Sequence, residues 1–246
     1  MDKGILSNVK VPKDWSEISL KQFRKIAALE EKQKEAQLFV EKISKENGQD
    51  EIDLNSIQQL EDFIVEFIFI MTGIDKEIIK NLPLDKLQDL AITLKNFTNT
   101  PIPIIKEPFI EIDGVLYMMD LNFNTLSFGT YIDLKMFPQN SKGKWDYAHS
   151  IAAVFLRPVT KTKSLLIKGK KLLKRKPNPE DYKISKYNHE EALKTSELFL
   201  EKLPMTYVYT IISFFLTRMQ LYATNIVDSS NQETQKKKLT LEIQKN

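Results

Sequence analysis

The chain has 246 residues, of which 42% are hydrophobic and 28% charged, so it has enough apolar material for a substantial core and is unlike a disordered polypeptide. It contains no cysteine, which excludes disulfides, thiolate metal sites and a cysteine nucleophile. Its 7 glycines make a doubly wound nucleotide-binding fold hard to build, and its formal charge of +3 is too close to zero to indicate a partner.

The N-terminal region is predicted to be helical. Ser19 and Gln22 have the spacing of a capping box and precede apolar residues at helical intervals, so we expect a helix from Ser19 to Leu29 or beyond. Residues 30–45 predict a second, more exposed helix that ends before Asn47-Gly48.

Three further helices are predicted before residue 100. Asn55 or Ser56 can cap a helix through Met71 that has almost no polar face, which places this helix in the core. Gly73 is positioned to end it. A short helix over residues 75–80 and an amphipathic helix over residues 84–97 then follow.

The periodicity changes after three prolines. Two short β-branched and aromatic runs, residues 109–112 and 115–118, flank Asp113-Gly114, which is a strong signal for a hairpin with a type I′ turn. A lone two-stranded ribbon is marginally stable in water. We therefore expect it to pack on helices or on strands of a neighbouring subunit.

Helices are predicted again downstream of the hairpin. Apolar spacing indicates one over residues 127–137 and another that follows Gly143 and runs through Tyr147 and Leu156, ended by Pro158. A helix is expected from Asn188 or His189 to Leu203, and a last apolar helix over residues 204–226.

The basic residues are concentrated in one segment. Residues 161–186 hold ten basic and two acidic residues, a net charge of +8, while the remainder holds 26 basic and 31 acidic residues, a net charge of −5. We predict a second, projecting hairpin here, with strands over residues 164–167 and 172–174. The candidate contacts to a partner or to DNA are Lys161, Lys163, Lys168, Lys170, Lys171, Lys174, Arg175 and Lys176.

Three interpretations of this basic hairpin remain open. It can contact phosphates, it can be a lysine-protected edge that discourages aggregation, or it can dock onto an acidic protein surface. The scarcity of arginine argues against sequence-specific reading of nucleic acid. In the tail, Leu239, Leu241 and Ile243 alternate with polar residues, and we expect them to form a short added strand that contacts another subunit.

Together these patterns predict a mainly α (α+β) fold, a helical bundle with one or two small β-hairpins. Its expected organisation is a helical core over residues 1–160 with a hairpin near 109–119, the basic projection over 161–187, helices over 188–227 that complete the core, and an extended tail over 228–246.

No catalytic residue, metal site or cofactor is predicted. His149 and His189 lack metal-binding spacing, and each is interpreted as a structural or interface residue rather than a general base. Residues 120–124 begin like a calcium loop, but Thr125 replaces the required glycine and Tyr131 the bidentate glutamate.

No signal peptide is apparent in the sequence, so synthesis in the cytoplasm is expected. The longest uncharged stretch, residues 203–217, is shorter than a membrane span requires. We expect no membrane association.

A series of short landmarks in a fixed order resembles proteins from the structural gene blocks of tailed phages of Bacteroidetes, including crAss-like phages, over roughly residues 15–225. These landmarks are Trp15-Ser16-Glu17-Ile18-Ser19-Leu20-Lys21-Gln22-Phe23, Thr72-Gly73-Ile74, Leu82-Pro83-Leu84, Ile112-Asp113-Gly114, Phe128-Gly129-Thr130-Tyr131-Ile132-Asp133, Leu156-Arg157-Pro158-Val159 and Phe199-Leu200-Glu201-Lys202-Leu203-Pro204. The basic segment and the tail after Val227 lie outside the pattern.

The resemblance implies a virion protein without catalysis, best matched by a ring or adaptor subunit of the head-to-tail connector. The expected partners are other copies of the chain in a ring, the portal, adjacent ring or tail proteins, and DNA through non-specific contact. The alternatives are a tail assembly chaperone that holds the tape-measure protein, and a DNA-binding accessory protein.

Overall fold

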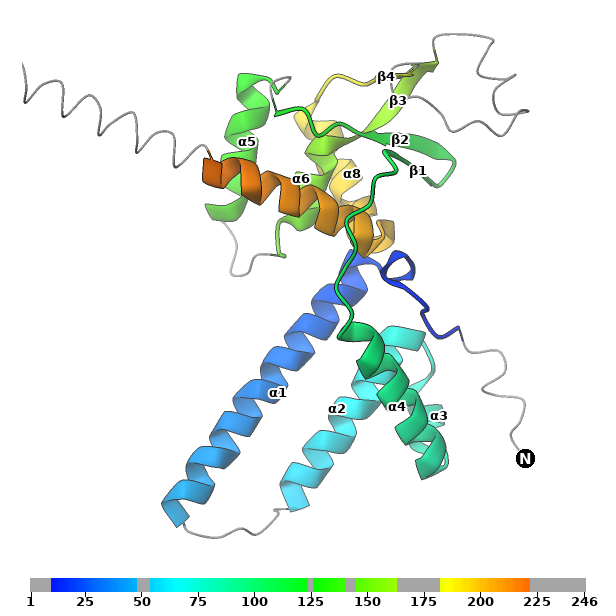
Figure 1. The fold of residues 1–246 in the computed structure, drawn as a ribbon, viewed down its shortest axis with the longest axis vertical. Helices are drawn as coiled ribbons and strands as arrows, with labels where there is room; N and C mark the ends of the chain where they lie inside the picture. The colour runs from blue at the N-terminus through cyan, green and yellow to red at the C-terminus, as the bar shows by residue number, and fades with distance from the viewer. Residues whose placement is uncertain (1–9, 48–53, 124–125, 140–144, 163–181, 222–246) are drawn as a thin grey trace, which may run out of the picture.

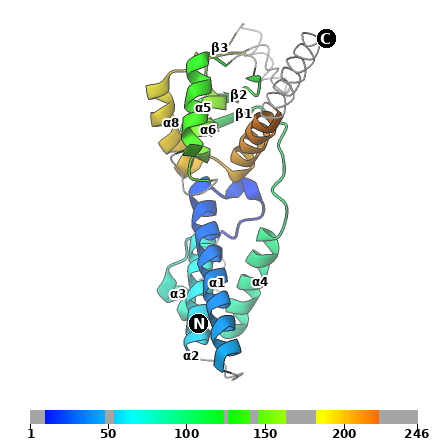
Figure 2. The same ribbon diagram turned by 90° about the vertical axis from the view of Figure 1, so that its left-hand side faces the viewer.

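The computed structural model describes residues 10–47, 54–123, 126–139, 145–162 and 182–221, and it has two parts (Figures 1 and 2). The helical part consists of four helices that extend away from the rest of the molecule: α1 (Leu20–Asn47), α2 (Leu54–Thr72), α3 (Lys76–Lys80) and α4 (Leu84–Thr98). The α/β part contains a small sheet and four helices: α5 (Phe128–Gln139), α6 (Ala148–Phe155), α8 (His189–Lys202) and a helix over residues 205–221, orange in Figure 1. The predicted mainly α, α+β fold is therefore confirmed.

The first two predicted helices are one helix in the structure. α1 is one continuous helix over Leu20–Asn47, where the sequence suggested two consecutive helices. No glycine or proline occurs between Leu20 and Asn47, and most of the residues around position 30 are strong helix formers. Its capping box is confirmed. The Ser19 backbone N–H donates to Gln22 Oε1 at 3.0 Å, and the Gln22 N–H donates to Ser19 Oγ at 3.3 Å.

The ends of α2 and α3 follow from local chemistry, as predicted. Gly73 adopts a positive φ of 73°, the left-handed conformation that ends α2. The Asp75 carboxylate then accepts a hydrogen bond from the Glu77 N–H at 2.9 Å and caps α3. The predicted helix over residues 84–97 is α4, with Leu94 fully buried.

Four antiparallel strands form the sheet in the order β1 (Phe109–Ile112), β2 (Val115–Met119), β3 (Leu156–Thr162) and β4 (Tyr182–Ile184). The predicted first hairpin is confirmed: Ile112 pairs with Val115 around Asp113 and Gly114, whose φ angles are 50° and 76°. The hairpin is supported within its own chain, because β3 pairs with β2 and the Tyr117 ring packs on Phe199 of α8.

β3 corrects one prediction. The sequence suggested a helix through Leu156 that is ended by Pro158, but α6 ends at Phe155 and a strand begins at once. Pro158 lies opposite Tyr117 in the ladder, and Val159 and Thr160 beside it favour a strand because they are β-branched. The predicted ribbon over residues 164–174 lies outside the described residues.

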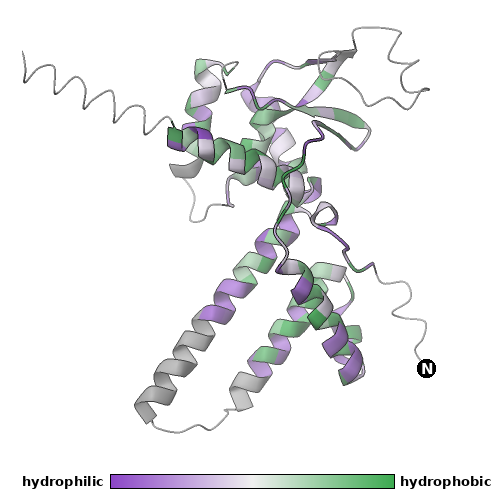
Figure 3. Cartoon of the chain, viewed as in Figure 1, coloured by the Kyte–Doolittle hydropathy of each residue, from purple (hydrophilic) through white to green (hydrophobic). Residues whose placement is uncertain are grey.

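One continuous hydrophobic core joins the two parts. The Trp15 indole N–H donates to the carbonyl and hydroxyl oxygens of Thr100, both at 3.1 Å, and so ties the segment before α1 to the end of α4. The Leu20 backbone N–H donates a hydrogen bond to the Leu203 carbonyl, and the Met205 N–H donates one to the Ile18 carbonyl. Figure 3 shows hydrophobic residues along α2 and the 205–221 helix, whereas hydrophilic residues are prominent on α1.

Candidate functional site

The basic segment connects two adjacent strands. Thr162 of β3 and Tyr182 of β4 are paired in the ladder, so the chain leaves the sheet and returns to it at the same point, far from the helical part (Figure 1). The Cα of Lys161 lies opposite that of Lys183. The other predicted contact residues lie outside the described residues: Lys163, Lys168, Lys170, Lys171, Lys174, Arg175, Lys176, Leu239, Leu241 and Ile243.

His149 lies in α6 and is half-buried. Burial lowers its pKa, and the positive charge of Arg24 lowers it further. Its Nδ1 atom is buried and has no hydrogen-bond partner among the described residues. A neutral imidazole in this position packs α6 and has no described group to orient it as a catalytic base.

His189 belongs to a three-residue cluster that the sequence did not reveal. Its Nδ1 lies 2.9 Å from Oδ2 of Asp133 in α5, and the Tyr187 hydroxyl donates to the same carboxylate oxygen at 2.6 Å. Burial, with the hydrogen bond to Asp133, raises the pKa of Tyr187 above its ordinary value. The cluster joins α5 to the start of α8, so its evident role is to fix the position of α5.

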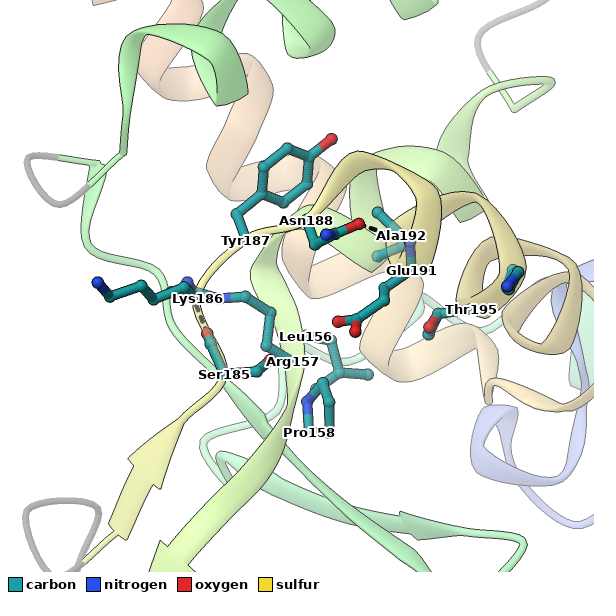
Figure 4. Close-up of a pocket in the computed structure, with 12 residues that line it drawn as sticks. Leu156, Arg157, Pro158, Ser185, Lys186, Tyr187, Asn188, Glu191, Ala192 and Thr195 are labelled. Atoms are coloured by element: carbon teal, nitrogen blue, oxygen red, sulfur yellow. Dashed lines mark hydrogen bonds between the residues drawn. The ribbon is translucent and has the colours of Figure 1, made fainter.

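A cavity of about 320 Å³ lies between β3, residues 185–188 and α8 (Figure 4). The Arg157 guanidinium on its wall donates to Asp120 Oδ2 at 2.7 Å and to the Ser185 carbonyl at 3.2 Å, while its Nε has no hydrogen-bond partner among the described residues. Three further charged residues, Lys186, Glu191 and Lys194, line it. The arrangement anchors β3, and the wall carries no nucleophile paired with a base.

The rejected calcium-like segment has a structural role at its first residue. Besides pairing with Arg157, the Asp120 carboxylate accepts a hydrogen bond from the Asn122 N–H at 3.1 Å. Among the residues that the structure describes, no group of three or more histidine, aspartate or glutamate side chains is placed to hold a metal ion.

The most conspicuous surface feature is the outer face of α5. Phe128, Ile132 and Met136 are 78%, 43% and 48% exposed, whereas Thr130 and Leu134 on the opposite face are buried. The three exposed residues are four positions apart and form one apolar row, here named the α5 stripe. The sequence predicted this helix, but apolar residues occur on all its sides, so it did not show which of them would face solvent.

None of the helices that the structure describes is both long and apolar enough to cross a membrane. No protein-family model, curated protein or solved structure compared with the chain matches it.

Proposed function

We propose that the chain is a non-enzymatic structural protein of a phage particle, a ring or adaptor subunit of the portal–tail connector. Its copies associate with one another and contact the neighbouring rings. The observation that carries this proposal is the α5 stripe, a row of three large apolar side chains that no described part of the chain covers. Contiguous exposed apolar patches on soluble proteins mark interaction sites.

The build of the molecule supports a mechanical role. Both parts share one hydrophobic core and are joined by side-chain contacts, including the ion pairs of Lys21 with Glu201 at 2.7 Å and of Arg24 with Asp146 at 3.0 Å. Exposed ion pairs contribute little energy individually, so the shared core supplies most of the rigidity. An elongated subunit with a fixed shape can hold neighbouring proteins at fixed positions relative to one another.

The phage-like landmarks fall at positions that determine the fold. Gly73 ends α2, Leu82-Pro83 precedes α4, Asp113-Gly114 forms the hairpin turn, and Leu203-Pro204 joins α8 to the next helix. Proteins that share a scaffold are expected to have the same residues at its turns and helix caps. The resemblance therefore supports a common architecture and the structural role that this architecture implies.

Sedimentation velocity of the purified chain tests self-association. With the concentration raised from about 1 to 100 μM, a range in which weak protein contacts form, the average mass should rise above the 28.6 kDa of the monomer. A mass that stays at 28.6 kDa over the whole range contradicts the proposal. Circular dichroism of the same sample shows whether the chain is folded.

A tail assembly chaperone is the second candidate, because the same exposed stripe could hold an apolar helix of the tape-measure protein. The two functions differ in their final location. A chaperone is released before the particle is complete, whereas a ring subunit remains in it. Co-purification with the tape-measure protein and absence from particles would favour the chaperone.

DNA is a proposed additional partner of the basic segment. The connection between β3 and β4 holds seven basic and two acidic residues over positions 163–181. A variant with Lys168, Lys170, Lys171 and Lys174 replaced by serine should bind duplex DNA more weakly, with a shallower salt dependence. Equal affinity and slope for the variant and the native chain would exclude DNA contact through these lysines.

A further inference from the structure

A second apolar row lies on α4, in the other part of the molecule. Leu84 and Ile92 are 68% and 59% exposed, and the exposed Gln88 lies between them at the same four-residue spacing. These three residues are named the α4 stripe. The opposite side of α4 packs against the core through Leu87, Leu90, Ala91, Leu94 and Phe97.

The two stripes match in length and carry opposite charges at their borders. Each spans positions i, i+4 and i+8, and so two turns of helix. The exposed carboxylates of Asp85 and Asp89 border the α4 stripe. Lys86 lies 3.6 and 4.0 Å from these two carboxylates, so the three side chains together carry one net negative charge. The exposed Lys135 borders the α5 stripe and lies over the Tyr131 ring at 4.9 Å from its centroid.

The stripes cannot meet within one chain. α4 lies in the helical part and α5 on the far side of the α/β part, and the views in Figures 1 and 2 agree on this separation. Because both parts share one core, a large relative movement would have to break that core. Complementary surfaces at separate places on one rigid chain can be satisfied only by different copies.

We propose that the α5 stripe of one copy docks against the α4 stripe of the next, with Lys135 facing Asp85 and Asp89. This inference rests on the proposed self-association and specifies its interface. The contact is head-to-tail, since each copy uses two different surfaces. Such a contact repeats until it closes into a ring, or it continues as a filament if the rotation between copies does not close.

The size of the stripes indicates a weak individual contact. Three large apolar residues on one partner and two on the other cover less than the roughly 800 Å² per partner of a standard stable interface. Dimers should therefore form only at high concentration. A closed ring is stabilised more strongly, because each copy is held by two contacts at once.

Two variants test the head-to-tail arrangement. The first carries Phe128→Gln, Ile132→Gln and Met136→Gln, and the second carries Leu84→Gln and Ile92→Gln. Glutamine is a good helix former, and all five positions are exposed, so both variants should fold. The matched control is Leu193→Gln in α8, an apolar residue that is 47% exposed and belongs to neither stripe, which should assemble like the native chain.

Each stripe variant alone should remain monomeric by sedimentation velocity. Their equimolar mixture should form dimers and nothing larger, because one intact α4 stripe meets one intact α5 stripe. A monomeric mixture, or association of the α4 variant with itself, overturns the head-to-tail contact. If both variants assemble like the native chain, this interface is wrong while self-association stands; if the native chain is monomeric, the proposed function itself fails.

Charge reversal tests the border of the interface. Lys135→Glu should weaken association about tenfold, an effect typical of one important interface residue. Asp85→Lys with Asp89→Lys in the same chain should restore it. Failure of the triple variant to regain affinity would contradict the pairing of these residues.

Discussion

The exposure of Phe128 can be tested by making one substitution at two phenylalanines. Phe128 is 78% exposed, whereas Phe199 in α8 is fully buried and packs edge-on against the Tyr117 ring at a centroid distance of 5.2 Å. Phe199→Ala removes a buried ring, which costs about 3–5 kcal/mol of unfolding free energy. Phe128→Ala loses only about 0.5 kcal/mol of burial, which the higher helix propensity of alanine offsets.

Urea unfolding followed by circular dichroism, at a concentration where the chain is monomeric, measures both effects. Phe128→Ala should unfold within about 0.5 kcal/mol of the native chain. Phe199→Ala should lower the free energy of unfolding by about 3–5 kcal/mol. In a thermal scan of the same variant, the Tm should fall by about 10 °C, since 1 kcal/mol corresponds to about 2–4 °C for a protein of this size. A cost above about 2 kcal/mol for Phe128→Ala would mean that the outer face of α5 is packed against its own chain, and the docking stripe would not exist.

Three further predictions concern local features of the fold. Gln22→Ala removes one half of the capping box with Ser19 and the hydrogen bond from the Gln22 amide to the Ile70 carbonyl, and it should cost at least about 1 kcal/mol in urea unfolding; an unchanged midpoint would show that the box is not formed. Gly73→Ala places a Cβ at a φ of 73° with no other atom within 4 Å, so the cost should be only about 1 kcal/mol of backbone strain, and a much larger loss would reveal a steric clash. Burial, with the negative charge of Glu107, raises the pKa of Tyr207 to about 12. Because the neutral hydroxyl is favoured in the folded state, the free energy of unfolding should fall as the pH rises from about 10 towards 12. Tyr207→Phe should make this fall shallower in urea unfolding. Equal pH slopes for the variant and the native chain would show that Tyr207 does not cause the fall.

Local signals in the sequence were sufficient to place most of the helices and the first hairpin. The cap of α1 involves Ser19 and Gln22, which are three residues apart, and the turn between β1 and β2 needs only Asp113 and Gly114. Such features are determined by neighbours along the chain, so they can be recognised without knowing the tertiary structure.

The errors have a tertiary origin. The start of β3 at Leu156 depends on pairing with β2, which lies about forty residues earlier in the chain, and a proline in the strand suggested a helix end instead. The sequence also did not indicate which face of α5 is buried. Leu134 and Ile132 are chemically alike, and only packing against the core makes the first buried and the second exposed.

The candidate site was predicted only in part. The sequence located the basic segment, and the structure adds that β3 and β4 pair at its two ends. The Asp133 cluster could not be predicted from the sequence, because Tyr187 and His189 are more than fifty residues from the carboxylate they contact. The α5 and α4 stripes required the tertiary structure, since exposure cannot be read from an apolar residue alone.

The most direct test of the proposed role is quantitative mass spectrometry of phage particles purified from the natural source of this sequence. A connector subunit should be present in every preparation, at a constant ratio to the portal protein that does not fall with further purification. Absence of the protein from particles, while it accumulates in the infected cell, would contradict a structural role in the virion.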